Sequence, residues 1–304
     1  MADYSFGVEI EVCAEPHTIR PPLITRHALY YEKLAASLRK RHLPAKANDL
    51  RSTRRSPDNY DAWWITRDGS IANSDPSRFL PFEAVSPILT LRGGWEANID
   101  TFWESFGKVF HLPKRDASCG SHIHISRGRN KRFTLSQLKT VAFGIVMYED
   151  LVKALLTAER QNNRFCRPNT EGSAQLRRCR TAAAAADLIK SVTTPSGLRD
   201  VMQDSRYVLW NFDNVLEGRS GTIEFRGGRF LRGVVRTKRW IAFAVAFIHA
   251  ILTMDDLKSP NYTSLESWTP QGLYKTIRSA AGQLGIRKYL PEDHMVMSER
   301  AHWV

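Results

Sequence analysis

Three short segments of the chain carry ionisable or hydrogen-bonding side chains at every second position. They are "FGVEIEV" (6–12), "HIHIS" (122–126) and "TIEFR" (222–226). Alternate residues of a β-strand face opposite sides, so each segment would have one apolar face and one face of potential ligands. A plain solvated sheet is the alternative, but such a face usually carries Thr, Lys and Ser, and neighbouring carboxylates repel. The pattern therefore favours a site for ions.

The polar faces of these segments offer ligands for a divalent cation and for an anion. Glu9 and Glu11 share one face, His122 lies on the second segment, and Glu224 lies on the third. A cation would remove the repulsion between the glutamates, and carboxylates with an imidazole suit Mg²⁺ or Mn²⁺ better than structural zinc. Arg226, beside Glu224, suits an anionic oxygen of a phosphate. We expect a metal–phosphate site on this polar face.

The elements that must position these residues are predicted from periodicity and from turn signals. Short strands with turn residues at their ends are expected at 4–14, in "AWWITRDGSIA" on both sides of a turn at Asp68-Gly69, in "FLPFEAVSPIL" up to Pro87, and in "CGSHIHISRG". A hairpin is expected from "SRYVLWNFDN" and "GTIEFRGGRF", which flank the turn "LEGRSG".

Helices are expected where apolar residues recur at helical spacing or where alanines accumulate. These segments are 25–42, 95–111, 134–160, "TAAAAADLIKSV", 234–256 and 269–285. The polar stretches 43–60 and "NNRFCRPNTEGSAQLRRC" are expected to be loops. Few strands alternate with helices at βαβ spacing. We therefore predict an α+β fold, with an antiparallel or mixed sheet and helices grouped on one face.

The charge of the chain is strongly positive. The chain contains 44 Lys and Arg residues and 31 Asp and Glu residues, which gives a formal net charge of +13. This balance fits a polyphosphate ligand, a nucleic acid or an acidic partner. Basic clusters recur along the chain, at 39–42, 51–55, 127–132, 177–180 and 226–239. Clusters without a positional motif are usually solvated faces, so charge alone does not decide among these partners.

The first residues, the longest apolar run and the cysteines indicate the cellular compartment of the protein. The first residues lack the positive charge and apolar run of a signal peptide. The longest apolar run, 240–254, contains His249 and is shorter than a bilayer span. Four cysteines without CxxC spacing predict buried thiols in a reducing compartment rather than a zinc site. We expect a soluble cytoplasmic protein without a membrane partner.

Five motifs, taken in order, resemble a known family. "FGVEIE", "DGSI", "EAVSPIL", "CGSHIHIS" and "RYVLWNFDNVLEGRSGTIEFRGGRF" resemble the putative amidoligase family. That family is similar to glutamine synthetase and glutamate–cysteine ligase, in the carboxylate–amine ligase superfamily. The motifs span residues 6–230, and the chain beyond them adds only helices.

The resemblance implies a glutamine-synthetase-like scaffold whose open sheet face holds ATP and two or three Mg²⁺ or Mn²⁺ ions. It implies transfer of the γ-phosphoryl group to a substrate carboxylate, followed by attack of an amine and formation of an amide. The carboxylate would belong to an amino acid, a peptide or a small metabolite. We predict a single amidoligase-like catalytic domain over 1–304, with a helical insertion at about 134–200 and a helical C-terminal part at about 234–304.

The resemblance also implies roles for the residues singled out above. Glu9 and Glu11 match the paired metal carboxylates of the family, His122 matches a metal-binding histidine, and Glu224 matches another metal ligand. Arg226 matches the arginine that stabilises the transferred phosphoryl group.

Further residues are implied on the nucleotide side of the site. His124 and Ser126 fall where the nucleotide phosphates are approached. Arg229 is a phosphate-binding candidate, although it could simply add positive potential.

The remaining candidates concern the two substrates. Glu83 is implied as a further metal, substrate or catalytic residue, and Asp68 as the group that binds or deprotonates the amine. Each could instead have no role in the site: Glu83 could be a surface acid, and Asp68 could be a turn residue. Arg206 and Asn211 are candidates for holding a substrate carboxylate or the nucleotide.

Two other functions stay open at this point. An amide-forming enzyme could take an activated aminoacyl group from charged tRNA, as a cyclodipeptide synthase does, and use the scaffold without ATP; the positive charge favours this alternative. A non-catalytic basic module that binds RNA or protein is the other possibility. The combination of Glu9, Glu11, His122, Glu224 and Arg226 argues against it, because a binding module has no need of that arrangement.

Overall fold

The computed structural model describes residues 3–18, 27–48, 59–72, 75–112, 117–254 and 268–299. The chain forms two compact units. Unit 1 consists of Met1–Tyr4, Ile123–Gly228 and Arg239–Val304, and unit 2 consists of Ser5–His122 and Arg229–Lys238. Each unit is therefore built from separate stretches of the chain, and strand β6 (Gly120–Ser126) contributes residues to both.

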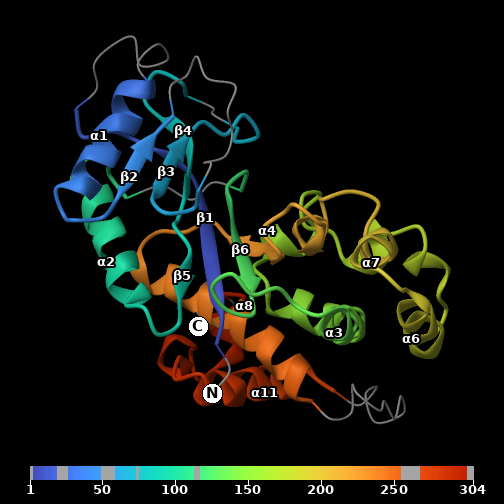
Figure 1. Ribbon diagram of the computed structural model, residues 1–304. Coiled ribbons are helices and arrows are strands. Elements are labelled where there is room, and N and C mark those ends of the chain that lie inside the picture. The colour runs from blue at the N-terminus through green and yellow to red at the C-terminus, as the bar shows by residue number, and fades with distance from the viewer. Residues whose placement is uncertain are drawn as a thin grey trace. The chain divides into compact units, whose positions relative to one another are not determined.

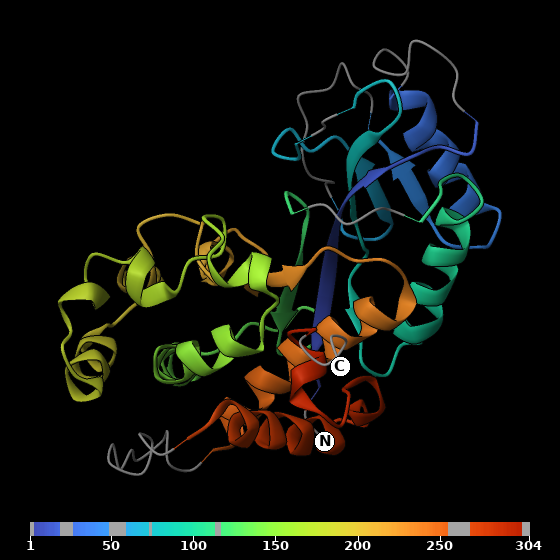
Figure 2. The same cartoon turned by 180° about the vertical axis from the view of Figure 1, so that it is seen from behind.

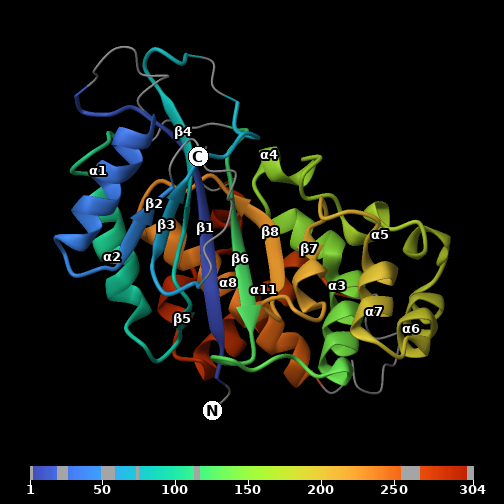
Figure 3. The same ribbon diagram turned by 45° about the horizontal axis from the view of Figure 1, so that its top comes forward.

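Unit 2 contains most of the strands. Its strand order is β2-β3-β4-β1 followed by the first residues of β6, and β5 also pairs with β1 (Figure 3). β2 and β3 are parallel, whereas β3–β4, β4–β1 and β1–β5 are antiparallel. The strand bounds are Ser5–Ala14 for β1, Ala45–Ala47 for β2, Trp63–Thr66 for β3, Leu80–Val85 for β4 and Leu89–Thr90 for β5.

Two helices cover one face of these strands, α1 (His27–Arg39) and α2 (Trp95–Phe106) (Figure 1). Tyr31 of α1 packs against Phe82 of β4, with 5.7 Å between the ring centroids. Phe102 of α2 stacks on Trp63 of β3 at 4.1 Å. Because side chains alternate along β4, the next residue, Glu83, faces the side that the helices leave uncovered.

Unit 1 contains the rest of β6, the two-residue strand β7 (Trp210–Asn211) and β8 (Ile223–Arg229) except for its last residue. Their order is β6-β8-β7. β7 and β8 are antiparallel, so the predicted hairpin is confirmed. Helix α8 (Val234–Thr253) covers one face, where Phe225 packs against Trp240 and Phe243 at 5.9 and 5.8 Å (Figure 2). Alternation along β8 leaves Glu224 and Arg226 on the other face.

The remaining helices of unit 1 surround the long helix α3 (Leu135–Leu155). Its first turn is fixed by a capping box between Thr134 and Gln137. The other α-helices are α4 (Ala158–Gln161), α5 (Asn169–Gly172), α6 (Ala182–Ser191), α7 (Pro195–Met202) and α11 (Pro270–Gln283). Short 3₁₀ helices lie at Leu176–Arg178, Asp213–Val215, Arg287–Tyr289 and His294–Val296.

The predicted fold class is confirmed: the structure is α+β, and its sheet is mixed and open. Three local predictions were wrong. The stretch after Asp68 is not a strand but a turn that the carboxylate of Asp68 holds by accepting hydrogen bonds from Ser70. The expected loops 43–60 and 162–179 contain β2 and α5 respectively. Parts of the predictions for 25–42, 43–60 and 234–256, and the basic cluster 51–55, lie outside the described residues.

Three of the four cysteines, Cys13, Cys119 and Cys166, are buried, as expected, and Cys179 is half-buried. In the described part of the chain, the helices lack the combination of length and apolar character that a bilayer span requires. The division into one domain with a helical insertion stays a prediction.

Candidate active site

Unit 2 gathers three glutamates and a histidine on the sheet face that α1 and α2 leave uncovered. Glu9 and Glu11 come from β1, Glu83 from β4 and His122 from β6. The antiparallel register places Glu11 directly opposite Glu83. Glu11 and His122 are buried, at 7% and 5% exposed, whereas Glu9 and Glu83 are half-buried.

His122 lies between the two glutamates of β1. Its Nδ1 atom is 2.8 Å from Oε2 of Glu9, and its Nε2 atom is 3.5 Å from Oε1 of Glu11. The other oxygen of Glu11 accepts a hydrogen bond from the backbone N–H of Gly120 at 2.5 Å. Short contacts thus fix the imidazole and both carboxylates, as is usual for side chains that hold an ion.

The cluster contains two overlapping groups that could hold a cation. Glu9, Glu83 and His122 each offer one ligand atom, and these atoms all lie within 4.8 Å of one another. Glu11, Asp68 and Glu83 do the same. Glu83 belongs to both groups, so an ion in either position would contact it. Carboxylate oxygens with an imidazole are suitable ligands for Mg²⁺ or Mn²⁺.

The electrostatics of Glu83 reflect this crowding. Burial of the carboxyl raises its pKa well above the usual value, and the neighbouring charges of Glu9, Glu11 and Asp68 raise it further, as does a hydrogen bond with Glu9. A proton on Glu83 would reduce the repulsion within the cluster. A bound cation would reduce the same repulsion by neutralising the carboxylates.

Asp68 is a turn residue whose carboxylate also lies close to the glutamates of the cluster. Its Oδ1 accepts a hydrogen bond from the backbone N–H of Ser70 at 2.7 Å, and its Oδ2 accepts one from the Ser70 hydroxyl at 2.9 Å. It is therefore a turn residue. The same carboxylate reaches Glu11 and Glu83 in the second ligand group. Its role toward an amine stays a prediction.

Unit 1 holds a second buried polar group on β7 and β8. Arg226 and Glu224 lie two residues apart on β8, and Nη1 of Arg226 is 2.5 Å from Oε1 of Glu224. Asn211 lies opposite Glu224 in the β7–β8 ladder and donates to Oε2 of Glu224 at 2.7 Å. Both oxygens of Glu224 therefore accept hydrogen bonds. Nε of Arg226 donates to the carbonyl of Phe165 at 3.3 Å, which fixes the guanidinium.

A further layer of residues, which the sequence did not identify, holds Asn211. Gln203 donates to Oδ1 of Asn211 at 2.6 Å and accepts from the backbone N–H of Phe212 at 2.6 Å. Gln203 also donates to Asp213, which in turn accepts from Arg199 at 2.7 Å. Gln203 follows α7 and is 1% exposed. A single buried amide leaves no periodic signal, so only the fold reveals it.

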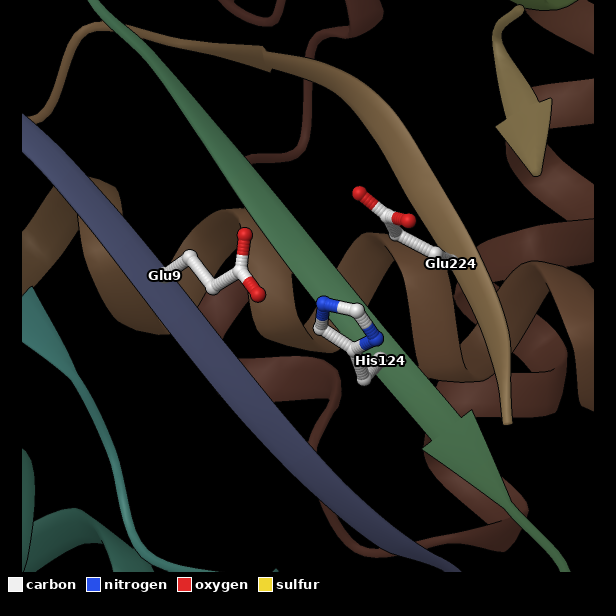
Figure 4. A group of neighbouring side chains, drawn as sticks. All are labelled: Glu9, His124 and Glu224. Carbon is white, nitrogen blue, oxygen red and sulfur yellow. The ribbon is translucent and has the colours of Figure 1, made fainter. Parts of the chain in front are cut away.

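His124 and Ser126 lie on the part of β6 that belongs to unit 1. Nδ1 of His124 is 3.4 Å from both the Thr222 hydroxyl and the Asn214 amide. Ser126 is buried and its hydroxyl is 3.5 Å from the carbonyl of Gly128. Figure 4 shows His124 on β6 and Glu224 on β8, together with Glu9 on β1. The contacts of His124 are long for hydrogen bonds, so its ring is not tightly held by them.

The last two predicted residues differ in their surroundings. Arg229 ends β8, is buried, and donates from Nε to the carbonyl of Phe230 at 3.1 Å. Arg206 is exposed, and its guanidinium lies 5.4 Å from the ring centroid of Tyr207. Among the described contacts, none joins Arg206 to Asn211, its predicted companion in substrate binding. The roles of both arginines stay predictions.

The sheet is mixed and open, and in unit 2 its uncovered face carries the carboxylates of β1 and β4. Residues 2–248 match the family model described as "Putative amidoligase enzyme". Because the match covers more than half of the chain, the protein belongs to this family. Membership supports an enzyme that forms amide bonds, which is a ligase in general terms. A search of curated proteins finds no match.

Proposed function

We propose that the protein is an ATP-dependent ligase that joins a carboxylate to an amine with the help of Mg²⁺ or Mn²⁺. One observation carries the proposal: Glu9, Glu11, Glu83 and His122 converge in a partly buried cluster of unit 2. Such a concentration of acids costs stability unless a cation or a proton offsets it. Buried ionisable clusters of this kind are typical of functional sites.

The donors of the cluster fit a hard divalent cation. Glu9, Glu83 and His122 would hold one ion, and Glu11, Asp68 and Glu83 would hold a second. When bound, such ions neutralise phosphate oxygens and orient them for in-line attack.

The reaction that this proposal describes has two steps. An oxygen of the substrate carboxylate attacks the γ-phosphorus of ATP, the bond to the β-phosphate oxygen breaks, and an acyl phosphate and ADP form. The amine then attacks the acyl carbon, the bond to the phosphate oxygen breaks, and the amide and phosphate form while the amine nitrogen loses a proton. In this scheme Asp68 contacts the N–H of the amine.

Arg226 is the residue of unit 1 that the proposal assigns to the phosphoryl group. Its guanidinium is oriented before substrate arrives, because Glu224 and the Phe165 carbonyl both accept its hydrogen bonds. A preoriented cation stabilises the charge of a transferred phosphoryl group without reorganisation. The assignments of His124, Ser126 and Arg229 to phosphate, and of Arg206 and Asn211 to substrate, are part of the same proposal.

The test is a turnover assay with the purified chain, ATP, Mg²⁺ and pooled amino acids. We expect release of ADP and phosphate, together with an amide product that mass spectrometry detects. Addition of EDTA should stop the release. The amine and the carboxylate are then identified by removing amino acids from the pool one at a time.

Two outcomes would overturn the proposal. Product that forms from charged tRNA without nucleotide turnover, and that is lost after RNase treatment, would indicate the tRNA-dependent enzyme instead. Absence of any product, with RNA retained equally by the wild type and by Glu9→Gln, would indicate a binding module.

A further inference from the structure

Unit 2 contains a cavity of about 500 Å³ that involves none of the candidate active-site residues. It lies beside α1 and the segment that follows α2. Four cationic side chains line it, Lys33, Lys40, Arg41 and Lys108, together with His17. A volume of a few hundred Å³ is typical of sites for small molecules.

The helical repeat explains how the cations come to share one cavity. Tyr30, Lys33, Ser37 and Lys40 recur at spacings of three and four residues, so they form one stripe along α1 and the turn that ends it. Lys108 follows α2 and faces this stripe across the cavity. The site is therefore built from segments distant in the sequence and is not a simple run of basic residues.

The positive charge of this cavity is only weakly compensated. Among the described residues that line it, none is a carboxylate. Arg41 has Glu104 at 3.9 Å, but the Glu104 side chain is 67% exposed and water screens the pair. The ammonium of Lys33 lies 4.7 Å from the ring centroid of Tyr30, which favours a cation at this place. A concave surface lined by one sign of charge concentrates ions of the opposite sign.

The walls of the cavity are held in place by hydrogen bonds. The Tyr30 hydroxyl donates to the carbonyl of Thr18 at 2.7 Å. Nε2 of His17 donates to the carbonyl of Gly107 at 2.9 Å, and this leaves the Nδ1 side of the ring beside His111 at 3.3 Å. These bonds connect the chain after β1 with α1 and with the end of α2. The cations thus project from a rigid frame.

The cavity lies on the opposite side of the unit 2 strands from the acidic cluster. Its wall is α1, which packs through Tyr31 on Phe82 of β4. Glu83 follows Phe82, so its side chain points to the other face of the same strand. A ligand in the cavity would therefore not be in contact with the carboxylates.

We propose that this cavity binds a small polyanion that carries two or more phosphate groups, at a site separate from the active site. Three of its four cations are lysines, which bind phosphate as point charges. The limited volume, about 500 Å³, favours a compact molecule, such as a nucleotide or an inorganic polyphosphate, over the extended backbone of RNA. The proposal is independent of the proposed ligase activity.

The test is calorimetric titration of the full chain with tripolyphosphate, in EDTA and at low ionic strength, so that no metal is present at the carboxylates. We expect binding that weakens as salt is added. Replacing two cations, Lys33→Gln with Lys108→Gln, should lower the affinity about tenfold or more. Lys108→Gln alone should lower it by a smaller factor, and its side chain is exposed, so the fold should tolerate this change.

The matched control is Lys275→Gln with Lys288→Gln, which removes the same charge from exposed positions of unit 1. Unchanged affinity in this control, with loss in the cavity variant, supports the proposal. Equal loss in both variants would overturn it, because binding would then follow net charge alone. A second titration uses a single-stranded RNA oligonucleotide. If only RNA binds, and the cavity variant weakens it, the small-ligand proposal is wrong and the cavity is part of an RNA surface.

Discussion

Glu11 of β1 and Glu83 of β4 are directly opposite one another in the antiparallel ladder of unit 2. Like charges at opposite positions destabilise a sheet. Here the cost is increased by burial and by Glu9 and Asp68, which also act on Glu83. Proteins keep such locally destabilising residues at functional sites. The pair therefore leads to a prediction about stability that does not require the substrates to be known.

Glu83→Gln should stabilise the metal-free protein while removing its response to metal. In EDTA, the variant lacks one of the crowded acids, so we expect its unfolding free energy to rise by about 1 kcal/mol. In Mn²⁺ or Mg²⁺, the wild type should gain stability because the ion binds only the folded state, and the variant should gain much less. Thermal denaturation with and without metal measures both effects.

The control for this prediction is Glu217→Gln, an exposed glutamate of unit 1. It removes the same charge from a site without crowding, so neither effect should appear. A Glu83→Gln protein that is less stable in EDTA, or equally stabilised by metal, would show that Glu83 is an ordinary structural acid.

Glu9→Gln and Glu11→Gln should each reduce nucleotide turnover by at least about 100-fold while the fold survives. Glutamine keeps the shape of the side chain but removes the charge that would hold a cation. Turnover is measured by ADP release, and the fold is checked by circular dichroism and by the unfolding midpoint. Full activity in both variants would refute the metal assignment.

Much of this site could be predicted from the sequence because strand alternation is local. It placed Glu9 with Glu11 and Glu224 with Arg226 on single faces, and the structure has both pairs there. The hairpin was also predicted from local signals, but its register, which places Asn211 opposite Glu224, was not. What could not be predicted was the β1–β4 register, because Glu83 is far from Glu11 in the sequence and their pairing depends on the whole sheet.

The missed elements have physical causes of their own. β2 has only three residues, Ala-Lys-Ala, which are too few for a strand signal, and it forms by pairing with β3. α7 did have a signal: Thr194 caps it, and Pro195 occupies its first turn. α5 is a single turn and depends on its neighbours rather than on its own propensity.

Asn211→Asp should destabilise the protein by about 3 kcal/mol at neutral pH. The amide nitrogen of Asn211 donates to Glu224 at 2.7 Å, so the variant places an acceptor and a second negative charge against a buried carboxylate. The amide oxygen of Asn211 already accepts from Gln203, so rotating the group offers no relief. Urea denaturation measures the change.

The matched substitution is Asn162→Asp, at the exposed C-terminal end of α4. It adds the same charge where water can solvate it, and its effect should be within about 0.5 kcal/mol. If the two variants lose similar stability, the hydrogen bond to Glu224 has no special weight and Asn211 does not position that carboxylate.

Glu149 gives a prediction about pH that is separate from the metal site. It lies on α3, is 4% exposed, and accepts hydrogen bonds from the hydroxyl and the backbone N–H of Thr170. Burial raises its pKa from 4.5 to about 7, against the opposing effect of these hydrogen bonds. The folded state therefore favours the protonated form, whose contribution to stability is complete below pH 4.5 and is lost as the pH rises through 7.

The loss across this window corresponds to about 3 kcal/mol. Glu149→Gln should remove it, because glutamine keeps an acceptor for Thr170 but does not ionise. We expect the stability of the variant, relative to the wild type, to be higher at pH 8 than at pH 5. Urea denaturation of both proteins at both pH values measures this change. Asp187→Asn, on the exposed face of α6, should follow the wild type at both pH values. If Glu149→Gln does so as well, Glu149 is ionised in the folded protein throughout this range, and its burial is offset by contacts stronger than those with Thr170.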